Sequence, residues 1–148
     1  MYNVKILMVV LFFGLAGLSS CKKDEVKKED LIRKDLWSNG GEWKLTKLVE
    51  RGMNGDDLFE KVSYDVGTFS FEENGKGVFI PTIIGYDILY FKYENTEFKL
   101  TLNYYDEDGD YGQQIWALEW EEKRIELFLL YESDENGYTE VFATLEKE

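Results

Sequence analysis

The residue types that carry most enzyme chemistry are scarce in this chain. Its 148 residues include no histidine and a single cysteine, Cys21. Without histidine there is no imidazole general base, no Ser-His-Asp or Cys-His nucleophile site and no histidine zinc site. One cysteine also cannot form a disulfide within the chain. We therefore predict that the protein is not an enzyme and has no catalytic residues.

Carboxylates are the reactive groups that the chain has in abundance, with 30 Asp and Glu residues. Asp106, Asp108 and Asp110 alternate in one expected hairpin loop, and calcium takes oxygen ligands of this kind. An EF-hand loop that began at Asp106 would need glycine where Tyr111 stands and a bidentate acid where Ala117 stands. Because both positions differ, a solvated acidic turn without a metal fits better, and calcium is the alternative.

Cys21 follows a segment that is typical of a secretory signal peptide, residues 1–20. Lys5 supplies a basic start, and residues 6–18 contain no charged side chain. As a helix these residues would span about 20 Å, less than the roughly 30 Å of a membrane's hydrocarbon core. Leu18-Ser19-Ser20-Cys21 resembles the bacterial lipobox. The resemblance implies cleavage between Ser20 and Cys21, lipidation of Cys21 and attachment to the membrane through the N-terminal lipid.

The next residues resemble a second targeting signal. Lys22-Lys23-Asp24-Glu25 resembles the surface-export signal of lipoproteins from the Bacteroidota, in which lysine and acidic residues follow the lipidated cysteine. The resemblance implies a lipid-anchored protein of the bacterial outer membrane that is displayed on the cell surface. The alternative is a solvated tether with no targeting role.

Charge divides the chain into a tether and an acidic domain. Residues 22–35 hold six basic and five acidic residues, whereas the chain from Gly41 onward holds ten Lys and Arg against 25 Asp and Glu, a net charge of −15. Nucleic acids and anionic membrane surfaces both need cationic protein surface, so we expect the domain to bind neither. A cationic protein partner is compatible with this charge.

The acidic domain, residues 41–148, shows the two-residue period of half-buried strands. Phe98, Leu100, Leu102 and Tyr104, for example, alternate with more polar residues. The pattern predicts strands at 42–51, 62–72, 77–82, 85–94, 97–105, 113–121, 124–132 and 139–146. Asn-Gly and Asp-Gly dipeptides between several of them are typical of hairpin turns.

Short connections between consecutive strands favour one architecture. We predict an all-β domain that forms a small eight-stranded antiparallel up-and-down barrel, with a β-sandwich as the alternative. Before it, residues 21–40 are expected to form the lipidated cysteine, a charged tether and a short amphipathic helix at Leu31–Trp37.

The last two strands allow a prediction of register. Pairing Leu129 with Ala143 turns the apolar sets of both strands to the same side and requires a loop of odd length. It also puts Leu130 opposite Phe142 on the outer face, with Phe128 beside them. An exposed apolar patch needs a cover. We expect the short helix to provide it, and the alternative is a surface that binds a partner.

Three further motifs connect the domain to a known family. Gly41-Glu42-Trp43 opens the first expected strand, as a Gly-x-Trp motif does in lipocalins, and Glu73-Asn74-Gly75 forms a turn after Phe69-Ser70-Phe71. With the lipobox and the strand count, the domain resembles the small lipocalin-like lipoproteins of the Bacteroidota. The resemblance implies a barrel closed at one end by Trp43 that binds a small apolar ligand with no cofactor. Lipocalins usually stack a last-strand arginine on this tryptophan, and residues 139–148 contain none.

Two functions are compatible with these features. In the first, the membrane-anchored barrel binds a small apolar or amphiphilic ligand, and Trp116, Trp120 and Tyr104 are the candidates that line its cavity. In the second, the barrel is filled by its own side chains. It then acts as an acidic interaction, inhibitor or immunity lipoprotein that binds a cationic protein partner through its surface.

Overall fold

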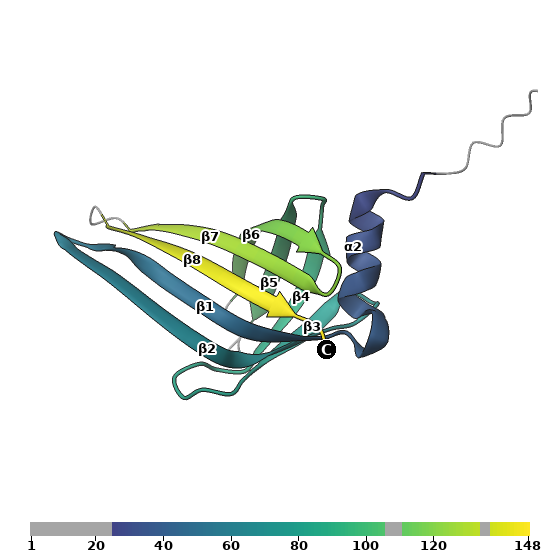
Figure 1. Ribbon diagram of the computed structural model, residues 1–148, viewed down its shortest axis with the longest axis horizontal. Coiled ribbons are helices and arrows are strands. Elements are labelled where there is room, and N and C mark those ends of the chain that lie inside the picture. The colour runs from purple at the N-terminus through teal and green to yellow at the C-terminus, as the bar shows by residue number, and fades with distance from the viewer. Residues whose placement is uncertain (1–24, 106–110, 134–136) are drawn as a thin grey trace, which may run out of the picture.

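The computed structural model of the protein describes residues 25–105, 111–133 and 137–148. Its strands are β1 (Glu42–Asn54), β2 (Asp57–Phe71), β3 (Lys76–Pro81), β4 (Leu89–Asn95), β5 (Lys99–Tyr105), β6 (Tyr111–Glu121), β7 (Arg124–Ser133) and β8 (Gly137–Glu146). Each strand pairs with the next, and β8 pairs antiparallel with β1 to close a barrel (Figure 1). The predicted eight-stranded antiparallel barrel is confirmed, and the sandwich alternative is wrong.

Two strands begin four or five residues away from the predicted position, and the other starts lie within two residues. β2 starts at Asp57 rather than at 62, because Asn54 pairs with Asp57 across a two-residue turn. Gly55 in that turn has a φ of +64°, the left-handed conformation that such hairpin turns need. β4 starts at Leu89 rather than at 85, because residues 82–88 form an irregular loop in which Gly85 has a φ of +103°.

A β-bulge bends β1 and β2 partway along their length. The register of β1 shifts between Leu45 and Lys47, and Thr46 between them has no cross-strand partner. On β2 the shift falls near Asp65, whose φ of +49° is left-handed. Thr46 donates its side-chain hydroxyl to the backbone carbonyl of Thr144 on β8 at 3.4 Å. Bulges increase the local bend and twist of strands, as closure of a small barrel requires.

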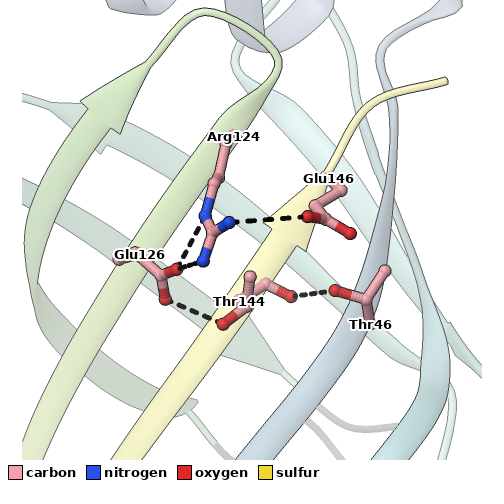
Figure 2. Close-up of polar contacts among 5 residues, drawn as sticks. All are labelled: Thr46, Arg124, Glu126, Thr144 and Glu146. Atoms are coloured by element: carbon pink, nitrogen blue, oxygen red, sulfur yellow. Dashed lines mark hydrogen bonds and ion pairs between the residues drawn. The ribbon is translucent and has the colours of Figure 1, made fainter.

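Polar side chains fasten the outer face around this bulge. Figure 2 shows the guanidinium of Arg124 between two carboxylates: it donates to Glu126 at 2.6 Å and lies 3.9 Å from Glu146. Glu126 also accepts a hydrogen bond of 2.8 Å from the hydroxyl of Thr144. Exposed ion pairs of this kind contribute little to stability.

The barrel is longer on one side than on the other. β2 pairs with β3 only over Gly67–Phe71, and β6 pairs with β7 only over Ala117–Glu121. Beyond these ladders the neighbouring strands part. Strands β7, β8, β1 and β2 therefore form a long group that extends past the short group of β3, β4, β5 and β6 (Figure 1). We call the end where only the long group continues the far end.

A helix lies across the opposite end of the barrel (Figure 1). It comprises α2 (Lys28–Trp37) and the 3-10 turn η1 (Ser38–Gly40). Ile32 and Leu36 of α2 are buried in the same apolar core as the barrel's inward-facing residues. No helix in the described part of the chain is long and apolar enough to cross a membrane.

Gly41 makes the turn from this helix into β1. Its φ is +68°, and a Cβ atom there would lie 2.0 Å from the backbone carbonyl oxygen of Phe71. The amide N–H of Phe71 donates to the carbonyl of Gly41 at 2.9 Å. Only glycine fits this close approach, which explains the glycine before Glu42-Trp43.

The predicted place of the helix and the predicted register of the last hairpin are both wrong. Leu129 pairs with Val141, two residues from Ala143, and Phe128 lies directly opposite Phe142. The predicted odd number of loop residues is confirmed, because Ser133 pairs with Gly137 and three residues separate them. The observed pairing centres the turn on residue 135, one residue earlier than the predicted pairing of Leu129 with Ala143.

Two of the three residues of the outer apolar patch pack against each other without the helix. The rings of Phe128 and Phe142 pack with centroids 4.9 Å apart, and the guanidinium of Arg51 lies 4.8 Å from the centroid of Phe142. Leu130 is left opposite Glu140 and is exposed. The helix packs at the barrel end instead, where Ile32 and Leu36 are fully buried in the core of the barrel.

Aromatic rings fill the barrel between β2, β3 and β4. Two glycines make room for them: a Cβ at Gly77 would lie 2.3 Å from the ring of Phe91, and one at Gly67 would lie 2.6 Å from the ring of Phe79. Rings over strand glycines are a known way to fill a sharply curved sheet. The contacting rings are Phe69, Phe71, Phe79, Phe91 and Tyr93.

Candidate ligand-binding end of the barrel

The helix end of the barrel is closed around Trp43. Its side chain is fully buried, and its indole Nε1 donates to the backbone carbonyl of Leu36 at 2.9 Å. The other end of α2 is held as well, because the side-chain amide of Asn95 on β4 donates to the carbonyl of Glu29 at 2.9 Å. The residue that the lipocalin resemblance offers for closing the barrel therefore lies directly beneath the helix.

Lys147 lies over Trp43, where the lipocalin resemblance implies an arginine. Its ammonium nitrogen is 4.9 Å from the centroid of the Trp43 ring, and its side chain is only 5% exposed. The ammonium also lies 3.5 Å from the carboxylate of Asp35 and donates to the backbone carbonyl of Asp35. This cation is a lysine one residue past the end of β8, in place of the arginine that lipocalins usually carry.

Trp120, a predicted ligand-lining residue, belongs to this closed end. Its indole Nε1 donates to the Asp35 carboxylate at 2.7 Å. The carboxylate of one helix residue thus accepts from Trp120 on β6 and faces Lys147 after β8. Trp120 therefore helps to hold the helix in place, away from the far end.

Trp116 and Tyr104, the other two predicted lining residues, lie nearer the far end. The indole Nε1 of Trp116 donates to the side-chain oxygen of Gln114 at 3.2 Å. The amide nitrogen of Gln114 in turn donates to the hydroxyl of Tyr131 on β7 at 2.8 Å. Continuing the β6–β7 register past Ala117 would bring Gln114 opposite Tyr131. This side-chain bond therefore bridges the two strands where their backbone ladder has ended.

A charged group enters the barrel interior on the opposite wall. Beyond the bulge, Glu50 follows buried Leu48 by two positions and pairs with buried Val141, so its side chain faces inward. Its carboxylate accepts a hydrogen bond of 3.3 Å from the hydroxyl of Tyr86, in the β3–β4 loop, and lies 3.5 Å from the ammonium of Lys61. Tyr86 and Glu50 together raise the pKa of Lys61.

Tyr131 connects these two walls electrostatically. Burial, then the nearby Tyr104 and Glu50, raise the pKa of its phenol. Tyr104 itself lies over a glycine, because a Cβ at Gly112 would be 2.3 Å from its ring. We call Glu50, Tyr86, Tyr104, Gln114 and Tyr131 the far-end cluster.

The far-end cluster stands above an apolar floor. Trp116, Leu129 and Val141 face inward beneath it and are each less than a tenth exposed. The arrangement offers three phenols, one amide and one carboxylate beside apolar surface. It can therefore donate and accept hydrogen bonds at the rim while the floor contacts an apolar group. The prediction included Tyr104 but missed the other four members. Tyr86 lies in an irregular loop, and the β1 bulge changes the face on which Glu50 lies.

Several predicted features lie outside the described residues. These are the signal peptide at 1–20, the cleavage position at Ser20, the lipidated Cys21 and the acidic loop of Asp106, Asp108 and Asp110. Within the ranges that the structure describes, no group of three or more Asp, Glu, His or Cys residues is placed to hold a metal ion.

Comparison with known proteins finds no protein-family model that matches this chain, and no curated protein matches it. The geometry of the barrel is therefore the main basis for assigning a function.

Proposed function

We propose that the chain is a lipid-anchored lipoprotein of the bacterial outer membrane whose lipocalin-like barrel binds a small amphiphilic molecule at its far end. The observation that carries the proposal is the asymmetry of the barrel. One end is plugged by α2 on Trp43, while the other presents the inward-facing far-end cluster above an apolar floor. Small-molecule sites combine apolar walls with a few convergent polar groups in this way.

The chemistry of the cluster indicates which part of a ligand binds where. Trp116, Leu129 and Val141 suit an apolar tail, since burying apolar surface contributes roughly 25 cal/mol per Å². The hydroxyl of Tyr131 and the carboxylate of Glu50 suit a polar end with donors, such as hydroxyl or ammonium groups. A strongly anionic headgroup would face Glu50 and the net charge of −15 from Gly41 onward.

The position of the helix fits an anchored protein whose far end faces away from the membrane. Residues 22–27 separate Cys21 from the start of α2 at Lys28. Fully extended, the chain from Cys21 to Lys28 reaches at most about 25 Å. A lipid on Cys21 would therefore hold the helix end close to the membrane. The ligand would then exchange with the aqueous phase at the far end.

The proposal is tested by identifying molecules that stay bound to the protein from its host. Wild type and a blocked variant, Thr139→Trp, are purified in parallel, extracted and compared by mass spectrometry. Thr139 faces inward at the rim, where it pairs with Tyr131 and Gly52. The matched control is Thr101→Trp, which adds the same side chain on the outer face of β5. We expect one small molecule in wild type and in the control that is depleted in the blocked variant. Identical extracts from all three proteins would contradict the proposal.

A further inference from the structure

β2 has a neighbour on both sides along only part of its length. It pairs with β1 from Asp57 to Ser70, but with β3 only from Gly67 to Phe71. Among the residues that the structure describes, the last backbone contact to the β3 side is from the amide of Thr82 to the carbonyl of Val66 at 2.9 Å. Residues 58–64 therefore form a strand edge at the margin of the long group (Figure 1).

The alternation of backbone bonds identifies the groups on this edge. Asn54 and Asp57 flank a two-residue turn and form a hydrogen-bonded pair. In antiparallel ladders such pairs alternate with pairs whose N–H and C=O groups point to the other side. The backbone groups of Leu58, Glu60 and Val62 consequently point away from β1. An unpaired edge of this kind is a template for another strand.

The side chains along the edge are unusually apolar for an exposed strand. Leu58 is 77% exposed and Tyr64 is 64% exposed, and Val62 is exposed as well. Proteins often protect such edges with lysine. The one lysine here, Lys61, lies on the inner face of β2, where its ammonium is 3.5 Å from Glu50. The one charged side chain on the outer face of residues 58–64 is Glu60, which pairs across the ladder with Arg51 of β1.

A hollow lies at one end of the edge. It has a volume of about 460 Å³, opens where β2 parts from β3 and is lined in part by Tyr64, Asp65 and Ile83. A side chain at that end of an added strand would have room in this hollow.

Charge decides which kind of strand fits. Glu60 lies between Leu58 and Val62 on the outer face of the edge. The domain from Gly41 onward carries a net charge of −15. A second copy of the chain would bring the same negative charge, and a symmetric register centred on residue 60 would oppose Glu60 to Glu60. A basic segment is therefore favoured over self-association.

We propose that residues 58–64 of β2 bind an extended basic segment of a partner protein by strand addition. A Lys or Arg of that segment lies opposite Glu60, and apolar residues lie opposite Leu58 and Val62. Backbone hydrogen bonds provide affinity, and the alternate side chains provide specificity. This interaction is separate from ligand binding at the far end, and neither depends on the other.

The first test uses hydrogen exchange and a model peptide, acetylated and amidated Thr-Val-Thr-Lys-Thr-Val-Thr. In the free protein we expect the amides of Leu58, Glu60 and Val62 to exchange quickly, while those of Phe59 and Lys61 are protected by β1. Saturation with the peptide should protect the amides of Leu58, Glu60 and Val62 from exchange. A peptide with N-methylated backbone nitrogens should fail to do so. If the amides of Leu58, Glu60 and Val62 are already protected in a concentration-dependent dimer, a second copy occupies the edge and the proposal is wrong.

The second test reverses the charges of Glu60 and of the peptide lysine that is proposed to lie opposite it. Glu60→Lys should lower affinity for the lysine peptide about tenfold, because an attractive cross-strand pair becomes repulsive. The same variant should bind a peptide with Glu in place of Lys more tightly. Glu94→Lys on β4 changes the net charge equally and is the matched control. Equal effects of the two substitutions, or no binding by wild type, would overturn the proposal.

Discussion

Lys147 lies over the indole ring of Trp43, with its ammonium nitrogen 4.9 Å from the ring centroid. The contact joins the residue after the last strand to the second residue of the first strand, beneath the helix. The same ammonium faces Asp35 of α2, whose carboxylate also accepts from Trp120. The closure of the barrel and the attachment of the helix thus depend on one small group of side chains.

Removing Lys147 should destabilise the protein. Lys147→Met leaves the Asp35 carboxylate without its cation in a mostly buried place, so we expect a loss of about 2 kcal/mol in the free energy of unfolding. Lys147→Arg should retain most of that stability, because guanidinium also stacks on aromatic rings. Urea unfolding followed by tryptophan fluorescence gives the values. Lys44→Met, which removes an exposed partner of Glu148, should have no measurable effect. Equal losses for Lys147→Met and Lys44→Met would contradict this account.

Two glycines with similar backbone angles should respond differently to alanine. Gly41 and Gly55 have φ values of +68° and +64°, but only at Gly41 would a Cβ meet backbone, 2.0 Å from the carbonyl oxygen of Phe71. Gly55→Ala should cost about 1 kcal/mol from the left-handed conformation alone. Gly41→Ala should cost at least about 2 kcal/mol more, because the backbone must shift. Thermal unfolding of both variants measures the difference, and similar losses would show that the tight turn is not needed.

Stability should fall in alkaline solution. Burial is the main cause that raises the pKa of both Tyr93 and Tyr131. A phenol with a raised folded-state pKa favours the folded state fully below the unfolded value of about 10 and loses that contribution as the pH rises through the folded value. We therefore expect the free energy of unfolding to decline above about pH 10, and less steeply in Tyr93→Phe. Tyr64→Phe removes an exposed phenol and is the control. A decline unchanged in Tyr93→Phe would contradict the assignment.

Lipidation can be tested independently of the barrel. If Cys21 carries the lipid, labelled palmitate should be incorporated into the wild-type protein, and Cys21→Ala should abolish the incorporation. Fractionation should then move the protein from the membrane to the soluble fraction. Labelling that persists in Cys21→Ala would rule out the lipobox interpretation.

The alternation of the sequence was sufficient to predict the barrel but not its interior. Inward-facing and outward-facing side chains alternate regularly in β5 to β8 because those strands have no bulge. In β1 the bulge at Thr46 changes which positions face inward, so Glu50 could not be placed from its distance to Trp43. Gln114 is two residues from Trp116, so the alternation does predict that its side chain faces inward. It was not included among the predicted lining residues because it is polar.

Long-range packing explains the other differences. The helix was recognised from its own amphipathic pattern, yet nothing local specifies which apolar surface it covers. Its place depends on Trp43, Trp120 and Lys147, which come from three different parts of the chain. Either register of the last hairpin keeps the apolar sets on one side, so the alternation alone did not distinguish the observed pairing of Leu129 with Val141 from the predicted pairing with Ala143.

Ligand binding at the far end is most directly tested by NMR of the tryptophan indole groups during titration with Nile red, a neutral apolar dye. The account predicts a saturable shift of the Trp116 indole signal, because this group forms the floor beneath Gln114. The signals of Trp43 and Trp120, which donate to Leu36 and Asp35 under the helix, should not move. Thr139→Trp should abolish the Trp116 shift, and Thr101→Trp should preserve it. A titration that shifts Trp43 and Trp120 instead, or leaves Trp116 unchanged at saturation, would contradict the central claim.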